Sequence, residues 1–455
     1  MSKKDLPRVP SLMSSLGPSF ILLGLALGSG ELIMWPFLSA NYGLGLLWGA
    51  LLGISFQFFL NTEIMRYSLY WGESVFAGFF RLSRHWPWWF VVSTFIPWGL
   101  PGFSSASAQI FGSLFLLNDT KWLAIAILIL TGLVLTLGKT LYTTMEKIQK
   151  IVIFAGFPFI LLLVLLLSSG QDWLDLGKGL IGKGDGFWFF PAGISLAAFL
   201  GAVAYSGAGG NLNLTQSYYI KEKGMGMGKW AVKIKSLLLK NKEAPLRGQS
   251  FVRNQENESR FFAWWKLVNG EHFLVFWLLG FLTIILLSLL AKSLVFGETV
   301  FEGIEFLFYE ASEISLRLNN IFGVVFLILA GVMLYSTQLG VLESSSRIIS
   351  ENIALSQKGI DKPVNLSLYF YLALWFQISL GVTLLLLGVE EPRFLLTLSA
   401  VLNAFAMTIS FPLIFILNRK RLASQFQPTK IRKAVLLLAF VFFVVFDFLV
   451  IKNLF

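Results

Sequence analysis

Two short glycine-rich segments interrupt apolar stretches of the chain, and both carry groups that could bind an ion or a small solute. The first reads Gly28-Ser29-Gly30-Glu31, and the second reads Gly207-Ala208-Gly209-Gly210-Asn211. Glycine weakens a helix and lets other groups approach its backbone. In an apolar setting, carbonyl oxygens freed in this way bind cations, and the N-terminal ends of half-helices favour anions. The candidate substrate-binding residues are therefore Gly28, Ser29, Gly30, Glu31, Gly207, Ala208 and Asn211.

Glu31 gives the first segment its charge, and it is the only acidic residue within the first ten apolar runs of the chain. A charge at membrane depth is costly unless it is paired, hydrated or bound to a cation. Glu31 and the amide oxygen of Asn211 are therefore the candidate metal ligands. The alternative is a structural carboxyl that is protonated or hydrogen-bonded. Asp447, in the last apolar run, is assigned no site role.

These segments belong to a chain with the composition of a membrane protein. Of its 455 residues, 56% are hydrophobic and 13% are charged, against roughly a quarter charged in soluble domains. A membrane-spanning helix needs about 20 apolar residues. We therefore expect an all-α integral membrane protein, and not a soluble enzyme, a nucleic-acid-binding protein or a disordered chain. The 11 predicted transmembrane helices are Leu16–Ser39, Leu44–Leu60, Trp88–Leu117, Trp122–Leu137, Ile148–Leu167, Phe187–Ser206, Phe273–Ala291, Ile321–Val341, Leu366–Leu387, Phe394–Leu417 and Ala434–Val450.

The positive charges predict how these helices are oriented. The chain has 36 Lys and Arg residues against 25 Asp and Glu, and most of the positive ones fall in loops on the same side as the N-terminus. Because cytoplasmic loops are enriched in Lys and Arg, we expect the N-terminus inside and the C-terminus outside. One long basic insertion, residues 221–266, lies on the inner side, and the sequence does not indicate its role. The net charge of +11 then reflects topology and contact with anionic lipids.

The positions of the two glycine-rich segments predict an internal repeat. They fall in the first and the sixth predicted helix, which are the first members of two successive sets of five. Broken helices at corresponding places in two halves are typical of inverted-repeat transporters. We expect a cytoplasmic N-terminus at 1–15, repeats at 16–170 and 171–425, and an eleventh helix at 426–455. The alternative is close helix packing on small residues, since Gly24 and Gly28 form a GxxxG pattern.

An ordered series of motifs resembles the Nramp family of divalent-metal transporters, over roughly residues 16–425 without the insertion. These motifs are Leu16-Gly17-Pro18-Ser19-Phe20, the segment from Met65 to Ser74, Met145-Glu146-Lys147, Gly210-Asn211-Leu212-Asn213-Leu214-Thr215, and Ser399 to Pro412 followed by Asn418-Arg419-Lys420. The resemblance implies a LeuT-like fold with 5+5 inverted repeats, broken helices 1 and 6, and a location in the plasma or inner membrane. It implies transport of a divalent cation by alternating access.

The departures from the family pattern bear on the substrate. The family's metal ligands, an Asp and an Asn in the first helix and a Met in the sixth, correspond to Gly28, Glu31 and Ala208 here. Sulfur ligands favour softer transition metals over Mg²⁺ or Ca²⁺, and the chain has no cysteine that could replace the lost sulfur. Because Mg²⁺ keeps several of its waters and needs few protein ligands, we expect a part-hydrated hard cation, with Mg²⁺ or Mn²⁺ favoured.

Proton coupling is expected to be weak or absent. The family's titratable residues in helices three and six correspond to Ala106, Gln109, Gly210 and Thr215, and none of these four residues has a titratable side chain. Intramembrane proton transfer normally needs chains of titratable groups. The two histidines, His85 and His272, are expected at the membrane interface.

Two other functions remain open on the same sequence. A transporter of a small polar organic solute would explain the missing metal ligands, and a sensor that lost transport would explain the basic insertion. An enzyme is the least favoured function, because no nucleophile–base arrangement is evident, and no cofactor or nucleic-acid partner is expected. Glu343 and Arg347 are four residues apart at the inner end of helix eight and predict a helix pair worth a few tenths of a kcal/mol. The oligomeric state cannot be read from the sequence.

Overall fold

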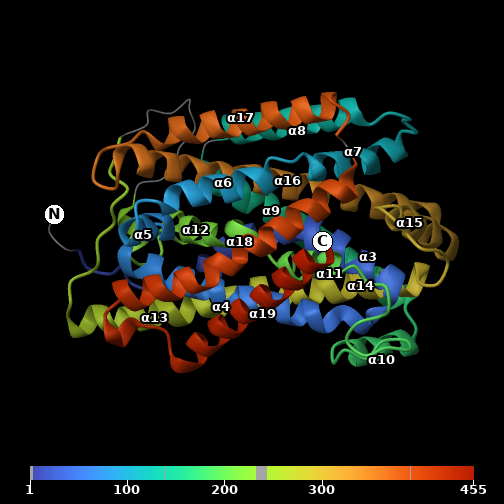
Figure 1. Ribbon diagram of the computed structural model, residues 1–455, viewed down its shortest axis with the longest axis horizontal. Coiled ribbons are helices and arrows are strands. Elements are labelled where there is room, and N and C mark those ends of the chain that lie inside the picture. The colour runs from blue at the N-terminus through green and yellow to red at the C-terminus, as the bar shows by residue number, and fades with distance from the viewer. Residues whose placement is uncertain (1–3, 139, 232–242, 390, 455) are drawn as a thin grey trace.

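A computed structural model describes residues 4–138, 140–231, 243–389 and 391–454, and these residues form a helical bundle without a strand (Figure 1). Two isolated bridges, Lys183 with Trp188 and Ala244 with Val364, are the extended pairings recorded there. Eight helices are long and apolar enough to cross a membrane, so the protein is a multi-pass integral membrane protein. They are Pro18–Tyr42, Leu44–Trp71, Leu141–Leu167, Gln255–Val295, Asn320–Lys358, Leu366–Leu386, Phe394–Arg421 and Lys430–Lys452.

Several of these long helices combine more than one element. The first contains α2 (Pro18–Ala26), η1 (Leu27–Met34) and α3 (Trp35–Tyr42), and the next contains η2 (Leu44–Leu46) and α4 (Leu47–Trp71). The helix from Gln255 to Val295 contains α13 (Gln255–His272), η5 (Phe273–Leu279) and α14 (Gly280–Val295). The remaining long helices are α9 (Leu141–Leu167), α16 (Asn320–Lys358), α17 (Leu366–Leu386), α18 (Pro392–Arg421) and α19 (Lys430–Leu454).

Shorter helices complete the bundle, and two pairs of them are halves of interrupted helices. The pairs are α6 (Trp86–Trp98) with α7 (Gly102–Leu114), and α11 (Leu196–Ala204) with α12 (Gln216–Lys223). The interruption after α6 was not predicted, although Pro97 and Pro101 explain it, because proline cannot donate the backbone hydrogen bond of a continuous helix. The others are α1 (Leu12–Ser15), α5 (Val75–Leu82), α8 (Lys121–Leu137), α10 (Gly170–Gly179) and α15 (Phe306–Arg317).

The first predicted interruption takes a different form from the one expected. The chain does not break at residues 28–31 but continues through η1 as a π-helix, with the Trp35 amide donating to the Gly30 carbonyl oxygen. Gly28 and Gly30 keep right-handed backbone angles, because neither is among the glycines with positive φ. A π-helix in the middle of an α-helix is rare and is frequently found at functional sites. The prediction of a broken first helix is therefore wrong in detail, although the distortion lies where it was expected.

The second predicted interruption is confirmed. Helix α11 ends at Ala204, and the chain then bends through residues 205–209 before the 3₁₀ turns of η3 (Gly210–Thr215) lead into α12. Gly209 and Gly210 have φ values of 76° and 51°. This is the left-handed region, which glycine adopts without a steric penalty. The two consecutive glycines are therefore the residues that allow the chain to change direction here.

The bundle has two distinct ends (Figure 1). Helix α5 and the start of α13 lie at one end, and α10 and α15 lie at the other. Part of the basic insertion, residues 232–242, lies outside the described residues. In the described part of the insertion, α12 ends at Lys223 and α13 begins at Gln255. Between them, residues 244–252 cross the first end of the bundle, where Arg247 pairs with Asp361 and the Val252 amide donates to the Lys4 carbonyl.

Candidate functional site

The two glycine-rich segments meet at the centre of the bundle. Gly30 of η1 lies against the backbone carbonyl of Tyr205, and a Cβ atom at Gly30 would be only 1.8 Å from that oxygen. One turn further along, the Trp35 indole donates a hydrogen bond of 2.9 Å to the Ser206 hydroxyl. All four residues are buried. The first helix and the break in the sixth are therefore in direct backbone contact, and only glycine fits at the closest point.

A methyl group at Gly30 is expected to disrupt this contact. Because the neighbour is a backbone carbonyl that cannot rotate away, Gly30→Ala should destabilise the protein by about 3 kcal/mol, the upper part of the range for overpacking. The measurement is the midpoint of unfolding of the purified protein in detergent. Gly270→Ala is the matched control, because nothing lies within 4 Å of a Cβ there, and alanine is favoured in a helix. Equal midpoints for the two variants would contradict the close approach.

Glu31 lies between η1 and α14 and is completely buried. Within the described residues neither carboxylate oxygen has a hydrogen-bond partner. The Thr283 hydroxyl is close enough to influence the carboxyl group, but it donates its own hydrogen bond to the Leu279 carbonyl, at 2.9 Å. A Cβ atom at Gly280 would be 3.5 Å from Oε1. Glu31 is therefore a buried acid that the surrounding protein does not neutralise.

Asn211 faces a different helix. Its side-chain amide donates to the hydroxyls of Ser93 and Thr94 on α6, at 2.8 and 3.0 Å, and its Oδ1 atom has no partner in the part of the chain that the structure describes. No contact recorded for the described residues joins Asn211 to Glu31. Within the same ranges, no three His, Cys, Asp or Glu side chains gather closely enough to hold a metal ion. The two predicted metal ligands thus face different helices, Glu31 toward α14 and Asn211 toward α6.

The remaining predicted site residues pack against neighbouring helices. The Gly28 amide donates to the Thr337 hydroxyl of α16, at 2.9 Å, and Ser29 bonds within its own helix. Gly207 lies against Gln57 and Phe276, and Ala208 is buried. Gly28 and Gly30 therefore serve close packing, which was the alternative for the first segment. Of the four positions that correspond to the titratable residues of the Nramp family, Ala106, Gly210 and Thr215 are buried and Gln109 is partly buried.

At the end of the bundle that carries α5, charged contacts surround the start of α2. The Glu271 carboxylate accepts hydrogen bonds from the Gly17 and Ser19 amides, at 3.2 and 3.1 Å, where the positive end of the helix dipole favours an anion. Lys150 and Lys223 both donate to the Leu16 carbonyl and to Glu146. The first helix is therefore fastened to α9, α12 and α13.

His272 belongs to the same region and lies inside the protein. Its ring is fully buried, stacks on Phe276 at 4.5 Å, and shares a hydrogen bond of 2.7 Å with the Ser19 hydroxyl. His85 is exposed, as expected. Its burial was not predicted, because the predicted span begins at Phe273, whereas α13 and η5 form one continuous helix through His272.

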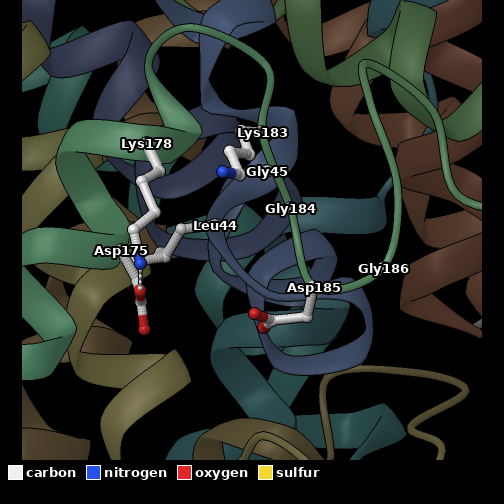
Figure 2. Close-up of a pocket in the computed structure, with 8 residues that line it drawn as sticks. All are labelled: Leu44, Gly45, Asp175, Lys178, Lys183, Gly184, Asp185 and Gly186. Carbon is white, nitrogen blue, oxygen red and sulfur yellow. Dashed lines mark hydrogen bonds and ion pairs between the residues drawn. The ribbon is translucent and has the colours of Figure 1, made fainter.

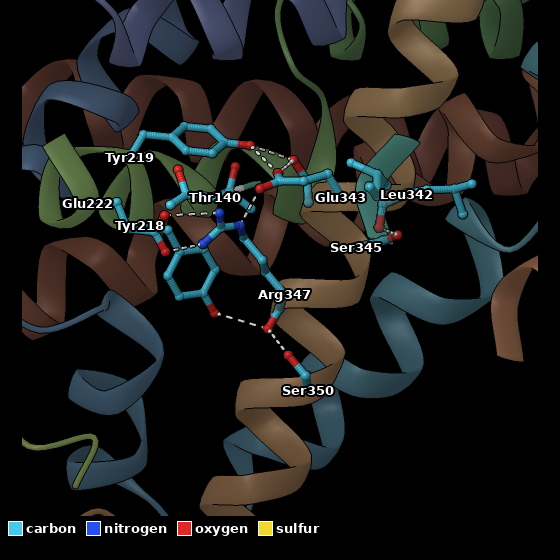
Figure 3. Close-up of polar contacts among 12 residues, drawn as sticks. Thr140, Tyr218, Tyr219, Glu222, Leu342, Glu343, Ser345, Arg347 and Ser350 are labelled. Carbon is cyan, nitrogen blue, oxygen red and sulfur yellow. Dashed lines mark hydrogen bonds and ion pairs between the residues drawn. The ribbon is translucent and has the colours of Figure 1, made fainter. Parts of the chain in front are cut away.

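A buried ion cluster between α12 and α16 was also missed (Figure 3). Arg347 pairs with Glu222 of α12, through contacts of 2.5 and 3.2 Å, and with Glu343 of its own helix. Tyr219 donates to Glu343 at 3.0 Å and shares a hydrogen bond with Ser344. Arg347 and both carboxylates are at most 2% exposed. The helix pair of Glu343 and Arg347 that the spacing predicted is therefore confirmed, but it is buried and forms half of a link between two helices.

A shallow pocket of about 160 Å³ lies at the opposite end, beside α10 (Figure 2). It is lined by charged residues of α10 and of the loop that follows it, among them Asp175, Lys178, Lys183 and Asp185. Asp175 and Lys178 already form an ion pair of 2.8 Å. The pocket contains none of the predicted site residues, so we treat it as a surface feature.

An ion pair beside this pocket predicts a pH dependence. Partial burial would raise the pKa of Asp172, but hydrogen bonds from Lys292, at 2.6 Å, and from Ser169 outweigh it and lower the pKa to about 2. A lowered pKa in the folded state adds stability above the unfolded pKa of about 4 and loses it as the pH falls toward 2. Asp172→Asn should therefore lower the unfolding midpoint at pH 7, and the difference from the unmodified protein should shrink between pH 4 and pH 2. A pH-independent difference, or the same one for exposed Asp185→Asn, would contradict this assignment.

Comparison with known proteins identifies solved structures with a similar fold. No protein-family model and no curated protein sequence matches the chain. Crystal structures of a manganese transporter from Eremococcus coleocola are similar, with a TM-score of 0.71 and 15% identity over 98% of this chain and 89% of that one. One of them is a complex with an aromatic bis-isothiourea compound.

A second fold relative is Mhp1, a nucleobase-cation-symport-1 family transporter in a closed conformation with bromovinylhydantoin bound. It has a TM-score of 0.55 and 11% identity over 100% of this chain and 96% of that one. At these identities the likeness establishes the fold. The predicted resemblance to the Nramp family is thus confirmed at the level of the fold, and the chain has the LeuT-like, all-helical architecture of these transporter structures.

Proposed function

We propose that the protein is a membrane transporter that works by alternating access around η1 and the break between α11 and η3. The observation that carries the proposal is Glu31, a fully buried carboxylate without a hydrogen-bond partner among the described residues, in a π-helix at the centre of the bundle. An isolated buried carboxylate must take up either a proton or a counter-charge. A cation that enters the bundle would supply that counter-charge.

The proposed substrate is a divalent cation, with Mg²⁺ or Mn²⁺ favoured. One carboxylate, with carbonyl oxygens of η1 and waters carried by the ion, suits a part-hydrated hard cation. Asn211 would join the ligands only after η1 and η3 move relative to one another, because the two side chains face different helices here. Transport is proposed to be weakly coupled to protons or uncoupled, since Ala106, Gln109, Gly210 and Thr215 cannot carry them.

The proposed topology has eleven crossings, with the N-terminus inside and the C-terminus outside. Three crossings add to the eight long helices, namely α8 and the interrupted pairs α6–α7 and α11–α12. The repeats at 16–170 and 171–425 would each contribute five crossings, and α19 the last. In this orientation the charged contacts at the start of α2 close the cytoplasmic side, and the host membrane is a plasma or inner membrane.

Ligand-dependent thermal stability tests the cation proposal. The purified protein is heated in detergent with Mg²⁺, Mn²⁺, Ca²⁺ or no divalent ion at equal ionic strength, and the unfolding midpoint is recorded. A ligand that binds only the folded state raises its stability by about 2.7 kcal/mol at a hundred times its Kd. A saturable rise with Mg²⁺ or Mn²⁺, followed by uptake of that ion into proteoliposomes, is the expected result. No response to any of the three ions would refute a divalent substrate.

A second candidate function is transport of a small polar organic solute. It is favoured by two uncharged side chains at or beside the break in the sixth helix, Asn211 and Asn403, whose Oδ1 atoms have no hydrogen-bond partner among the described residues. These groups offer hydrogen bonds but no charge.

A further inference from the structure

A strap of non-helical chain lies across the end of the bundle that carries α5. It consists of residues 244–253 of the basic insertion, and Figure 1 shows it in yellow-green, running along that end to the start of α13. We call these residues the strap. Its backbone hydrogen bonds reach parts of the chain that are far apart in the sequence, from Lys4 to Val364.

The first half of the strap binds the link between α16 and α17. Ala244 and Val364 exchange two backbone hydrogen bonds, of 3.3 and 3.1 Å, in an antiparallel bridge. The Arg247 amide donates to the Ile360 carbonyl at 3.1 Å, and the Arg247 guanidinium forms an exposed ion pair with Asp361. Water can replace each of these contacts, so this half of the strap can leave the link between α16 and α17 without burying an unpaired group.

The middle of the strap lies on the end of α4. The Gly248 amide donates a hydrogen bond of 2.7 Å to the Glu73 carboxylate, and a Cβ atom at Gly248 would be 2.2 Å from the Trp71 carbonyl oxygen. Glu73 is 1% exposed and also accepts hydrogen bonds from Tyr67, at 2.6 Å, and from Arg81, at 3.0 Å. The strap therefore follows the surface of α4 closely and shares an acid with it.

One side chain anchors the strap. Phe251 is fully buried, and its ring packs against Tyr70, Phe261 and Phe426, with centroids 5.2, 5.9 and 5.7 Å away. These rings belong to α4, to α13 and to η6 (Ser424–Phe426), the turn after α18. The other strap residues are partly or fully exposed. Because burial of an aromatic ring is the largest apolar contribution that a single residue makes, the strap is held firmly on the α4 side and only by exchangeable contacts on the α16 side.

The strap and the Arg347 cluster join the same two sides of the bundle. Arg347 connects α16 to α12. Helix α12 is followed by η4 (Gly226–Trp230), where the Met227 carbonyl lies against Gly72 at the end of α4. The strap connects the chain beyond α16 to that same end of α4. Separation of α16 from α12 and α4 would therefore pull the first half of the strap away from the link between α16 and α17.

We propose that the strap is an inhibitory clasp, which stays anchored on α4 through Phe251 and must release the link between α16 and α17 before this end of the bundle opens. The inference rests on the proposed alternating-access function, and it gives a role to a described part of the insertion. The clasp re-forms when the end closes, because the anchor keeps its first half beside its partners.

A disulfide bond across the bridge tests the clasp in a chain that has no cysteine of its own. Residues that exchange two backbone hydrogen bonds in an antiparallel pair have Cα atoms about 5.5 Å apart, which suits a disulfide bond. Ala244→Cys combined with Val364→Cys is reconstituted in proteoliposomes, and uptake of Mg²⁺ and Mn²⁺ is measured after oxidation and again after reduction with dithiothreitol. Oxidation should lower the uptake about tenfold and reduction should restore it, since the closed state is then held covalently. Each single-cysteine variant is a control and should respond to neither treatment.

A second measurement does not depend on the transported ion. Ser350→Cys provides a reporter thiol between α16 and α12, because Ser350 is buried and bonds to the Arg347 carbonyl, to which Tyr218 of α12 also donates. With this reporter in place, Phe251→Ala removes the anchor. The rate of maleimide labelling of the reporter in purified protein should rise about tenfold, as the open state becomes more populated.

Two further variants, each carrying the same reporter, make the labelling result specific. Gly248→Ala should also speed labelling, because the added methyl group meets the Trp71 carbonyl and displaces the strap. Phe262→Ala is the matched control, since Phe262 packs on Phe426 in the same aromatic group but is 47% exposed and lies outside the strap. Its labelling rate should equal that of the reporter protein with an unmodified strap.

The outcomes separate the clasp from the proposed function. Uptake that is equal before and after reduction of the double-cysteine protein would overturn the clasp and leave the transporter proposal standing. Absence of Mg²⁺ and Mn²⁺ uptake in every variant would refute the divalent substrate, and the labelling rates then decide about the clasp alone. Unchanged labelling in whichever of Phe251→Ala and Gly248→Ala folds would overturn it.

Discussion

Replacing Glu31 by glutamine is expected to abolish the response of the protein to divalent cations. Glutamine has nearly the same shape, but its amide carries no charge, so the Coulomb attraction that compensates the dehydration of a divalent ion is lost. The unmodified protein should gain about 2.7 kcal/mol at a hundred times the Kd of its ion. Glu31→Gln should gain nothing at the same concentration. The readout is the shift of the unfolding midpoint, with uptake into proteoliposomes as a second measurement.

The same variant is expected to be more stable than the unmodified protein when no cation is present. Neither carboxylate oxygen of Glu31 has a partner in the described structure, and an amide is cheaper to bury than an unpaired charge. A misfolded variant would lose both cation binding and stability. Loss of binding together with higher stability would therefore show that Glu31→Gln removes the binding site and leaves the fold intact.

Asp447→Asn provides the matched control. Asp447 is also a buried acid, 5% exposed, but it accepts a hydrogen bond of 2.6 Å from Thr408 and lies in the last helix, away from η1. Its replacement should leave the cation response intact. A normal response in Glu31→Gln would take Glu31 out of the cation site, and loss of the response in both variants would point to a general effect of buried charge.

The sequence predicted the break in the sixth helix because the backbone there requires a particular residue. Two consecutive positive φ values at Gly209 and Gly210 can be adopted without strain only by glycine, so the structural need is visible in the residue type. The first helix carries an equally glycine-rich segment but does not break. Gly28 and Gly30 are small because Thr337 and the Tyr205 carbonyl approach them closely. Residue type alone does not distinguish a glycine that turns the chain from one that makes room for a neighbour.

The burial of these ion pairs was not predicted because hydropathy locates only the apolar part of each helix. The second predicted span ends at Leu60, whereas α4 continues to Trp71 and buries Glu63 and Arg66 as a pair. The same holds for Glu343 and Arg347, since α16 extends to Lys358. In these cases a charge of opposite sign three or four residues away was visible in the sequence. The third partner, which comes from another helix as Glu222 does, could not be predicted from the sequence.

Replacing Arg347 by methionine is expected to be the most destabilising single change in this part of the protein. Methionine fills a similar volume but leaves the carboxylates of Glu222 and Glu343 buried without their common counter-charge. Removing one partner of a buried ion pair costs about 3–5 kcal/mol, and here two acids lose the same partner. The measurement is the unfolding midpoint of the purified protein. Arg247→Met is the control, because Arg247 and Asp361 are 60% and 68% exposed, and such surface pairs contribute about 0–1 kcal/mol.

A compensating variant tests whether the loss comes from unpaired charge or from lost packing. In Arg347→Met combined with Glu222→Gln and Glu343→Gln, all three positions are neutral, and replacing a complete buried ion set by neutral residues is often tolerated. The triple variant should therefore recover much of the stability that Arg347→Met loses. Because Arg347 joins α12 to α16, and these helices would separate if this end of the bundle opened in the proposed alternating-access cycle, the triple variant should also transport its ion faster than the unmodified protein. A triple variant as unstable as Arg347→Met would show instead that packing, and not charge, holds this end of the bundle closed.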